Sequence, residues 1–270
     1  MEEWRLIRSP FLDGHFNMAV DEALLLSTLR NQTPPVLRLY GWEPPCLSLG
    51  FSQSVADINK TALLKNGWNY VRRPTGGKAI LHIDEITYSV CAPVDSPAVK
   101  GNLLESYRQL SKGLLAALEI LGVRATADKE YETKQTGHNH PVCFEVPSNY
   151  EITVAGKKLI GSAQSRKYGG VLQHGALPLS GDIARINDVL SYPNEEIRKE
   201  ARQRIYLHAT TLQEVIGRII PWNEVAEACI SGFENALGIR LIDSSITNEE
   251  LALAQDLLHS KYEAPEWNDK

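Results

Sequence analysis

Apolar and polar positions alternate with a period of two through the first two thirds of the chain. This spacing is typical of strands that turn one face toward a core. It predicts strands over residues 4–8, 36–40, 47–51, 70–73, 79–82, 86–91, 150–154, 158–164 and 171–178. We expect residues 4–8 to form an edge strand, and the last three ranges to form a meander.

A second set of segments has apolar residues at helical spacing. It predicts helices over residues 17–29, 57–65, 103–121, 196–204, 212–219, 224–237 and 248–259. Strands dominate the first two thirds and helices the last third, which predicts an α+β fold. We expect one catalytic unit over residues 1–270, with a core at 1–182 and a helical extension at 183–270. A separate small helical domain, divided from the core within residues 183–208, is the alternative.

Composition and charge narrow the classes of protein. The chain has 270 residues, 43% of them hydrophobic, and a net charge of −5. An acidic balance argues against bulk nucleic-acid binding, which needs a basic surface. The N-terminus is acidic, and no apolar run reaches the length that spans a membrane. We therefore expect a cytoplasmic protein that binds neither nucleic acid nor membrane.

The four cysteines, Cys46, Cys91, Cys143 and Cys229, lie far apart and form no C-x-x-C pair. This pattern fits a reducing compartment and neither a disulfide framework nor a zinc ribbon. His138 and His140 precede Cys143 with metal-like spacing, but no clear fourth ligand follows in the sequence. We predict no metal site.

The chemistry is concentrated around a lysine that follows a turn glycine. Lys158 enters a short apolar segment that becomes glycine-rich at Gly161, and Cys143 precedes Lys158 by 15 residues. An ammonium beside a thiol favours the thiolate, so the pair could form an activated sulfur nucleophile. The alternative is a surface lysine on a hairpin and a small buried thiol.

A second glycine-rich stretch, Val71 to His82, reads as a strand, a tight turn and another strand. The adjacent Gly76 and Gly77 leave backbone N–H groups uncovered for an acyl carbonyl or a phosphate. A Walker-type phosphate loop fits poorly, because Ala79 follows Gly77-Lys78 where Ser or Thr is required. Arg72 and Arg73 alternate across their strand, so only one of them should face this turn.

Four stretches with a fixed order and spacing cover most of the chain. They are Asn17-Met18-Ala19-Val20-Asp21-Glu22-Ala23, Arg72-Arg73-Pro74-Thr75-Gly76-Gly77 with His82, Lys158-Leu159-Ile160-Gly161-Ser162-Ala163-Gln164, and Gln173-His174-Gly175. Together with the tail from Lys261 to Asn268, they resemble the lipoate-protein ligase A and octanoyltransferase superfamily. The resemblance implies a biotin/lipoyl-protein-ligase-like catalytic domain, in which helices flank a mixed sheet.

Within that superfamily the chain most resembles the LipM-type octanoyltransferases. Their nucleophile lies in a Cys-Phe-(acidic)-x-Pro-Ser-x-Tyr context, which residues 143–150 fit. The ATP-dependent ligases typically have a third glycine where this chain has Lys78, and they lack a cysteine matching Cys143. The LipB-type transferases place their cysteine beyond the lysine, and here no cysteine lies between Lys158 and Cys229.

The resemblance implies an octanoyl-[acyl-carrier-protein]:protein N-octanoyltransferase. Cys143 would form the acyl thioester and Lys158 would lower its pKa. We expect substrate contacts from Arg73, Thr75, Gly76, Gly77, Lys78, His82, Gly161, Ser162, Ala163 and His174. The acyl chain needs an apolar slot, for which Ile80, Leu159, Ile160 and Ala163 are candidates.

The expected donor is octanoyl-acyl carrier protein. The expected acceptor is a lipoyl-domain protein, such as the glycine cleavage H protein or a dehydrogenase E2. Exchange of one thioester for another, followed by amide formation, needs no ATP, so we expect no cofactor. Basic clusters at Arg72, Arg73 and Lys78, and at residues 157–167, could steer an acidic partner.

Three alternatives remain open. An ATP-dependent lipoate-protein ligase would use Lys158 on an acyl-adenylate and leave Cys143 incidental. An amidotransferase would move octanoyl between lipoyl proteins with the same cysteine. A non-enzymatic binding protein would retain the fold alone.

Overall fold

The computed structural model describes residues 1–30, 33–127 and 151–270. Within these ranges, seven strands form a mixed sheet in the order β10-β1-β2-β6-β9-β8-β7. The strands are β1 (Glu2–Arg8), β2 (Val36–Tyr40), β6 (Glu85–Pro93), β7 (Ile152–Val154), β8 (Lys157–Lys167), β9 (Gly170–Pro178) and β10 (Ile239–Asp243). Strands β10, β1 and β2 run parallel, and the remaining pairs are antiparallel.

A small three-stranded sheet lies beside the large one, in the order β4-β3-β5. It contains β3 (Cys46–Leu49), β4 (Asn69–Arg72) and β5 (Ile80–His82). The loop between β4 and β5 is the glycine-rich turn of the sequence analysis, so this sheet holds that turn in place.

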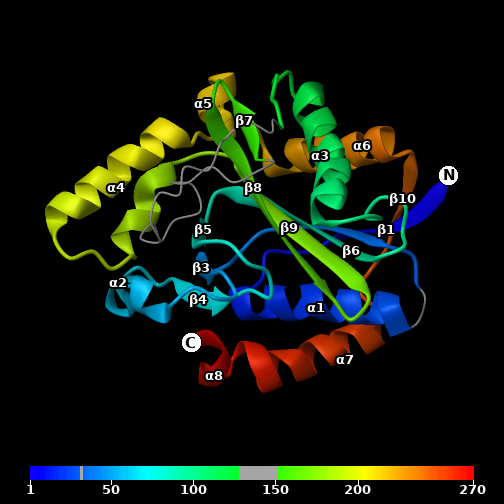
Figure 1. Cartoon of the computed structure of the whole chain (residues 1–270), viewed down its shortest axis with the longest axis horizontal. Helices are drawn as coiled ribbons and strands as arrows, with labels where there is room; N and C mark the ends of the chain where they lie inside the picture. Colours follow the sequence, from blue (N-terminus) through cyan, green and yellow to red (C-terminus); the bar gives the residue numbers. More distant parts are fainter. Residues whose placement is uncertain (31–32, 128–150) are drawn as a thin grey trace.

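Helices cover both faces of the large sheet (Figure 1). They are α1 (Gly14–Arg30), α2 (Lys60–Lys65), α3 (Leu103–Ile120), α4 (Glu195–His208), α5 (Leu212–Ile216), α6 (Trp222–Leu237), α7 (Asn248–Leu257) and α8 (Pro265–Asn268), with helical turns η1 (Val55–Asp57), η2 (Ile183–Asp188) and η3 (Leu258–Tyr262). None of the helices in the described ranges is long and apolar enough to span a bilayer.

Strand β2 shows why the sheet needs cover on both sides. Leu37 and Leu39 belong to the apolar cluster that includes α3 and α6. Val36 and Tyr40, at the alternate positions, belong to the cluster that includes α1 and α7. Alternate side chains of β2 therefore pack into two different apolar cores, one on each face of the sheet, and every residue of β2 is buried.

Helix α3 begins with a capping box. The Asn102 side chain accepts from the N–H groups of Leu104 and Glu105, and Glu105 accepts from the Asn102 N–H. Such a box satisfies N–H groups that have no partner inside the helix. Helix α5 ends three residues before the prediction, because Gly217 takes a left-handed conformation with φ 83°.

The prediction of an edge strand at residues 4–8 is wrong. Strand β1 pairs with β2 on one side and with β10 on the other. The sequence pattern did not predict β10, in which Ile239 alone is buried and the other side chains are partly or fully exposed. A strand with one buried residue lacks the alternation that identifies strands.

Candidate active site

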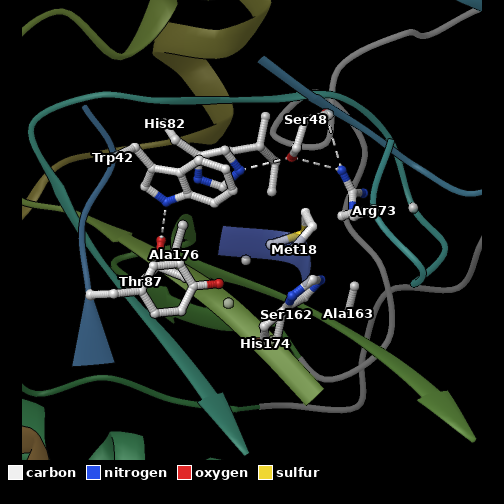
Figure 2. A pocket seen from close by; sticks show the side chains of 15 residues that line it. Met18, Trp42, Ser48, Arg73, His82, Thr87, Ser162, Ala163, His174 and Ala176 are labelled. Carbon is white, nitrogen blue, oxygen red and sulfur yellow. Dashed lines mark hydrogen bonds between the residues drawn. The ribbon is translucent and has the colours of Figure 1, made fainter. Parts of the chain in front are cut away.

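A narrow pocket lies between the small sheet and the middle of the large sheet (Figure 2), with about 410 Å³ of empty space including its mouth. Its lining residues come from α1, β2, β3, β5, β6, β8, β9 and the glycine-rich turn. They are Met18, Tyr40, Trp42, Ser48, Arg73, Gly77, Ile80, His82, Thr87, Gly161, Ser162, Ala163, His174, Gly175 and Ala176. Distant parts of the sequence thus meet around one cavity.

Glycines let the backbone close around this pocket. A Cβ at Gly175 would lie 2.6 Å from the carbonyl oxygen of Gly161 on the neighbouring strand. A Cβ at Gly50 would lie 1.8 Å from the carbonyl oxygen of Gly77, which itself has φ +95°. Both approaches are too short for any side chain, so these glycines fix the width of the pocket.

A buried chain of hydrogen bonds holds His174 against the pocket wall. The Asp21 carboxylate accepts from Arg38 Nη1 at 2.7 Å and from Tyr40 OH at 2.8 Å, and its Oδ2 lies 3.4 Å from His174 Nδ1. On the other side of the ring, Nε2 lies 2.6 Å from Thr75 Oγ1. With Asp21 ionised, Nδ1 carries the proton and Nε2 accepts from the Thr75 hydroxyl.

The pKa values of this chain follow from burial and charge. Burial alone would raise the pKa of Asp21, but the Arg38 charge and the hydrogen bonds of His174 and Arg38 outweigh it and lower that pKa. Burial lowers the pKa of His174, and the nearby charges of Arg73 and His82 lower it further. The hydrogen bond and the charge of Asp21 raise this pKa but do not outweigh the burial. His174 is therefore a neutral ring at neutral pH.

A second chain fixes His82 on the opposite wall. Its Nδ1 lies 2.8 Å from Glu85 Oε1, and its Nε2 lies 2.7 Å from Ser48 Oγ. Arg73 Nη1 donates to the same Ser48 hydroxyl at 3.1 Å. The ring of Trp42 stacks on His82 with centroids 3.9 Å apart and planes 13° apart. Both ring nitrogens of His82 are thus engaged within the wall, and Figure 2 shows the bond to Ser48.

The interior that remains is apolar. The apolar side chains that face it are those of Met18, Ile80, Ala163 and Ala176. Each histidine is hydrogen-bonded to the polar side chains of its own wall. An apolar slot whose histidine nitrogens are already hydrogen-bonded suits a hydrocarbon chain, because those nitrogens lose no water when the chain enters.

Lys158 is placed by the β7–β8 hairpin, whose turn residues Ala155 and Gly156 have φ 49° and 78°. Its side chain is 4% exposed and its ammonium contacts the Glu151 carboxylate. The neighbouring Lys157 instead donates to the Tyr206 carbonyl at 2.7 Å. The two adjacent lysines thus have separate surroundings, and the buried one lies three residues before Gly161 on β8.

Seven of the ten predicted substrate contacts line the pocket: Arg73, Gly77, His82, Gly161, Ser162, Ala163 and His174. The other three do not line the pocket but contact residues that do. Thr75 holds His174, and the carbonyl groups of Gly76 and Lys78 each accept from Arg73 Nη2 at 2.8 Å. Cys143, and the histidines at 138 and 140, lie outside the described residues.

The candidate acyl-slot residues divide between the pocket and the core. Ile80 and Ala163 line the pocket, whereas Leu159 and Ile160 belong to the apolar core beneath α3 and α6. Sequence reasoning missed Trp42, Ser48, Asp21 and Glu85. Asp21 carried a signal, since a carboxylate within an apolar helix turn must find a partner when that face is buried.

The fold and its apolar pocket can be compared with those of known proteins, and the comparison gives the family. Residues 13–234 match the lipoyl protein ligase A/B catalytic domain, and the chain belongs to this family.

Its relatives include octanoyltransferases of the LipM type. The octanoyltransferase LipM of Kyrpidia tusciae is 42% identical over 99% of both chains. The octanoyltransferase LipM of Bacillus subtilis is 38% identical over 100% of this chain and 99% of its own length.

Solved structures agree with the fold. The chain superposes on lipoate-protein ligase A bound with ATP with a TM-score of 0.81 and 26% identity, covering 100% of this chain and 99% of that one. A bipartite lipoate protein ligase from Thermoplasma acidophilum gives a TM-score of 0.84 at 24% identity, over 100% and 97% of the two chains. The predicted α+β fold with a lipoyl-ligase-like mixed sheet is confirmed.

Proposed function

We propose that this chain transfers an octanoyl group from an acyl carrier protein to a lysine of a lipoyl-domain protein, through a thioester on Cys143. The coarser activity follows from the relatives. Octanoyltransferases at about 40% identity align over the full length, and the chain is an acyltransferase of octanoyl groups in protein lipoylation.

The observation that carries the donor side of the proposal is the narrow apolar pocket. It is lined by aliphatic side chains and by histidines whose ring nitrogens are already bonded. A saturated acyl chain fits this chemistry, because burying each methylene stabilises the complex by about 0.8 kcal/mol. The backbone of Gly77, in the turn between β4 and β5, and that of Gly161, on β8, line the pocket where the acyl carbonyl would enter.

The other cysteines are poor nucleophiles. Burial raises the pKa of Cys229 to about 12 and raises those of Cys46 and Cys91 well above the usual range. A buried neutral thiol attacks slowly, because the thiolate is the nucleophile. This supports assigning the thioester to Cys143.

The reaction then has two steps. The Cys143 thiolate attacks the carrier thioester carbonyl, and the carrier thiolate leaves. The acceptor lysine, as a neutral amine, then attacks the carbonyl of the new thioester. The amine nitrogen loses a proton, the Cys143 thiolate leaves, and an amide remains. Lys158 stabilises the thiolate in both steps, and a shift of one pKa unit corresponds to about 1.4 kcal/mol.

Intact-mass spectrometry after incubation with octanoyl-acyl carrier protein tests the proposal. The unaltered chain should gain one octanoyl group that neutral hydroxylamine removes, and Cys143→Ala should gain none. Cys229→Ala is the matched control and should label like the unaltered chain. Equal labelling of Cys143→Ala would refute the assignment.

Donor mixtures separate the alternatives. Octanoyl-acyl carrier protein should support modification of a lipoyl domain without nucleotide. Modification from free octanoate and ATP that survives Cys143→Ala would instead identify a ligase. Faster transfer from an octanoylated lipoyl protein than from the carrier would identify an amidotransferase.

A further inference from the structure

The basic residues that the sequence suggested for steering a partner are largely engaged inside the protein. The Arg72 guanidinium donates to the carbonyl groups of Gly50, Gln53 and Lys270, among others. The Arg73 guanidinium donates to carbonyl groups of the glycine-rich turn, and Lys158 is buried against Glu151. These three charges therefore do not form an exposed docking surface.

An exposed cluster of lysines and aromatic rings lies where the β8–β9 turn meets the C-terminal segment. We name Phe51, Lys167, Tyr168, Trp267 and Lys270 the lysine–aromatic surface. Lys167 Nζ lies 4.5 Å from the Phe51 ring centre, and Lys270 Nζ lies 4.4 Å from that of Trp267. The two rings are 5.7 Å apart, so the four groups form one patch.

The patch is open and positively charged. Phe51 is 38% exposed and Tyr168 is 69% exposed. Among the described residues, no ion pair includes Lys167 or Lys270, and two carboxylates of this region pair with other lysines. Glu22 pairs with Lys261 at 2.6 Å, and Asp269 pairs with Lys60 at 2.8 Å. Within the part of the chain that the structure describes, two ammonium groups without an ion pair thus flank the two rings.

The patch is also held in place. Arg72 Nε donates to the Trp267 carbonyl at 2.9 Å, and Trp267 Nε1 donates back to the Arg72 carbonyl at 2.8 Å. The Val55 N–H donates to the Lys270 carbonyl at 2.9 Å. A surface with fixed groups loses less conformational entropy when a partner binds.

Two paths connect this surface to the pocket. The Phe51 N–H donates to the Thr75 carbonyl at 2.9 Å, and Thr75 holds His174. Strand β8 runs from Ala163 in the pocket to Lys167 in the patch, four residues or roughly 13 Å away. A partner seated on the patch therefore stands roughly 13 Å along β8 from the pocket.

We propose that the lysine–aromatic surface docks an acidic face of the acyl carrier protein donor, an inference that rests on the function proposed above. A carrier holds its thioester on a long flexible arm, so its body can dock about 13 Å from the site. An acceptor lysine has a four-carbon stem and must bring its own backbone closer. Lysines steer an acidic partner, and exposed rings supply apolar contact area.

The test is a charge reversal, Lys167→Glu together with Lys270→Glu. With octanoyl-acyl carrier protein alone, kcat/KM for acyl-enzyme formation should fall about tenfold at low ionic strength, and the loss should shrink in high salt. The octanoyl thioester of a short uncharged thiol should load both proteins equally. Lys112→Glu with Lys199→Glu, on α3 and α4, is the matched control and should load normally from either donor.

Three results would overturn the proposal: no loss with the carrier, an equal loss with the small thioester, or a loss confined to transfer from acyl-enzyme to the lipoyl domain. The last would assign the surface to the acceptor. Failure of the proposed function would look different, because the unaltered chain would then form no acyl-enzyme from either donor.

Discussion

Replacing Asp21 by Asn should destabilise the protein and disturb the pocket together. Asp21 and Arg38 are both fully buried and form an ion pair at 2.7 Å. The carboxylate also accepts from Ser89 Oγ and Tyr40 OH, each at 2.8 Å, and holds His174. The amide keeps the shape of the side chain but removes its charge and one acceptor.

The size of the effect follows from the burial of both partners. The amide oxygen can still accept from Arg38 and Ser89, so the main loss is the counter-charge of a buried guanidinium. Breaking a buried pair by removing one partner costs about 3–5 kcal/mol. Since domains are typically stable by about 5–15 kcal/mol, this is a large share of the total.

Urea denaturation at neutral pH measures this loss. The pKa of Asp21 is lowered by the fold, so its contribution is full above the unfolded value of about 3.9 and is lost as the pH falls through the folded value. The gap between Asp21→Asn and the unaltered chain should therefore narrow below about pH 4. A neutral-pH loss under 1 kcal/mol would refute the reasoning.

A double variant separates charge from packing. Asp21→Leu with Arg38→Met removes both charges and keeps apolar volume, so it should be more stable than Asp21→Leu alone. If the double variant loses the sum of the two single losses, the pair is not coupled. Ring-nitrogen NMR of His174 in Asp21→Asn should show a change of tautomer, which a purely structural loss would not produce.

Further predictions concern the lysine, the turn and the tail. Lys158→Ala should shift the pH profile of Cys143 alkylation upward, while Lys157→Ala should not; an unchanged profile in Lys158→Ala contradicts their coupling. Gly50→Ala should weaken octanoate binding, measured by calorimetry, at least tenfold, because its Cβ would meet a glycine-turn carbonyl at 1.8 Å; wild-type affinity would contradict this. Arg72→Lys should lower the urea midpoint, because an ammonium cannot replace the guanidinium's bonds to the C-terminal carbonyls, and an unchanged midpoint would argue otherwise.

Local pattern predicted most elements of this fold. The period-two ranges became strands with ends shifted by at most three residues, and the 103–121 range became α3. The wrong predictions concerned features that depend on contacts between distant parts of the chain. Strand β10 is defined by pairing with β1, and its own side chains are mostly exposed, so no local signal marks it. For the same reason β1 could not be recognised as an inner strand.

The sequence predicted those residues of the candidate site that belong to short local motifs. Glycines and the lysine of a turn can be identified from a few neighbouring residues, and Gly77 and Gly161 do line the pocket. The supporting carboxylates could not be assigned in this way. Asp21 reaches His174 across 153 residues of sequence, and Asp21 lies on a helix whose buried face is otherwise mainly apolar.

These long-range bonds also change what the histidines do. A histidine such as His174 can act as a general base when one of its ring nitrogens is free. In the structure Nδ1 faces Asp21, Nε2 faces Thr75, and burial lowers its pKa. Protonation of His174 Nε2 would require the Thr75 hydroxyl to change from hydrogen-bond donor to acceptor. His82 is held by Glu85 and Ser48 in the same manner. The two histidines therefore form part of the pocket wall, and under the proposed function we expect groups outside that wall, such as Lys158, to carry the proton transfers of acyl exchange.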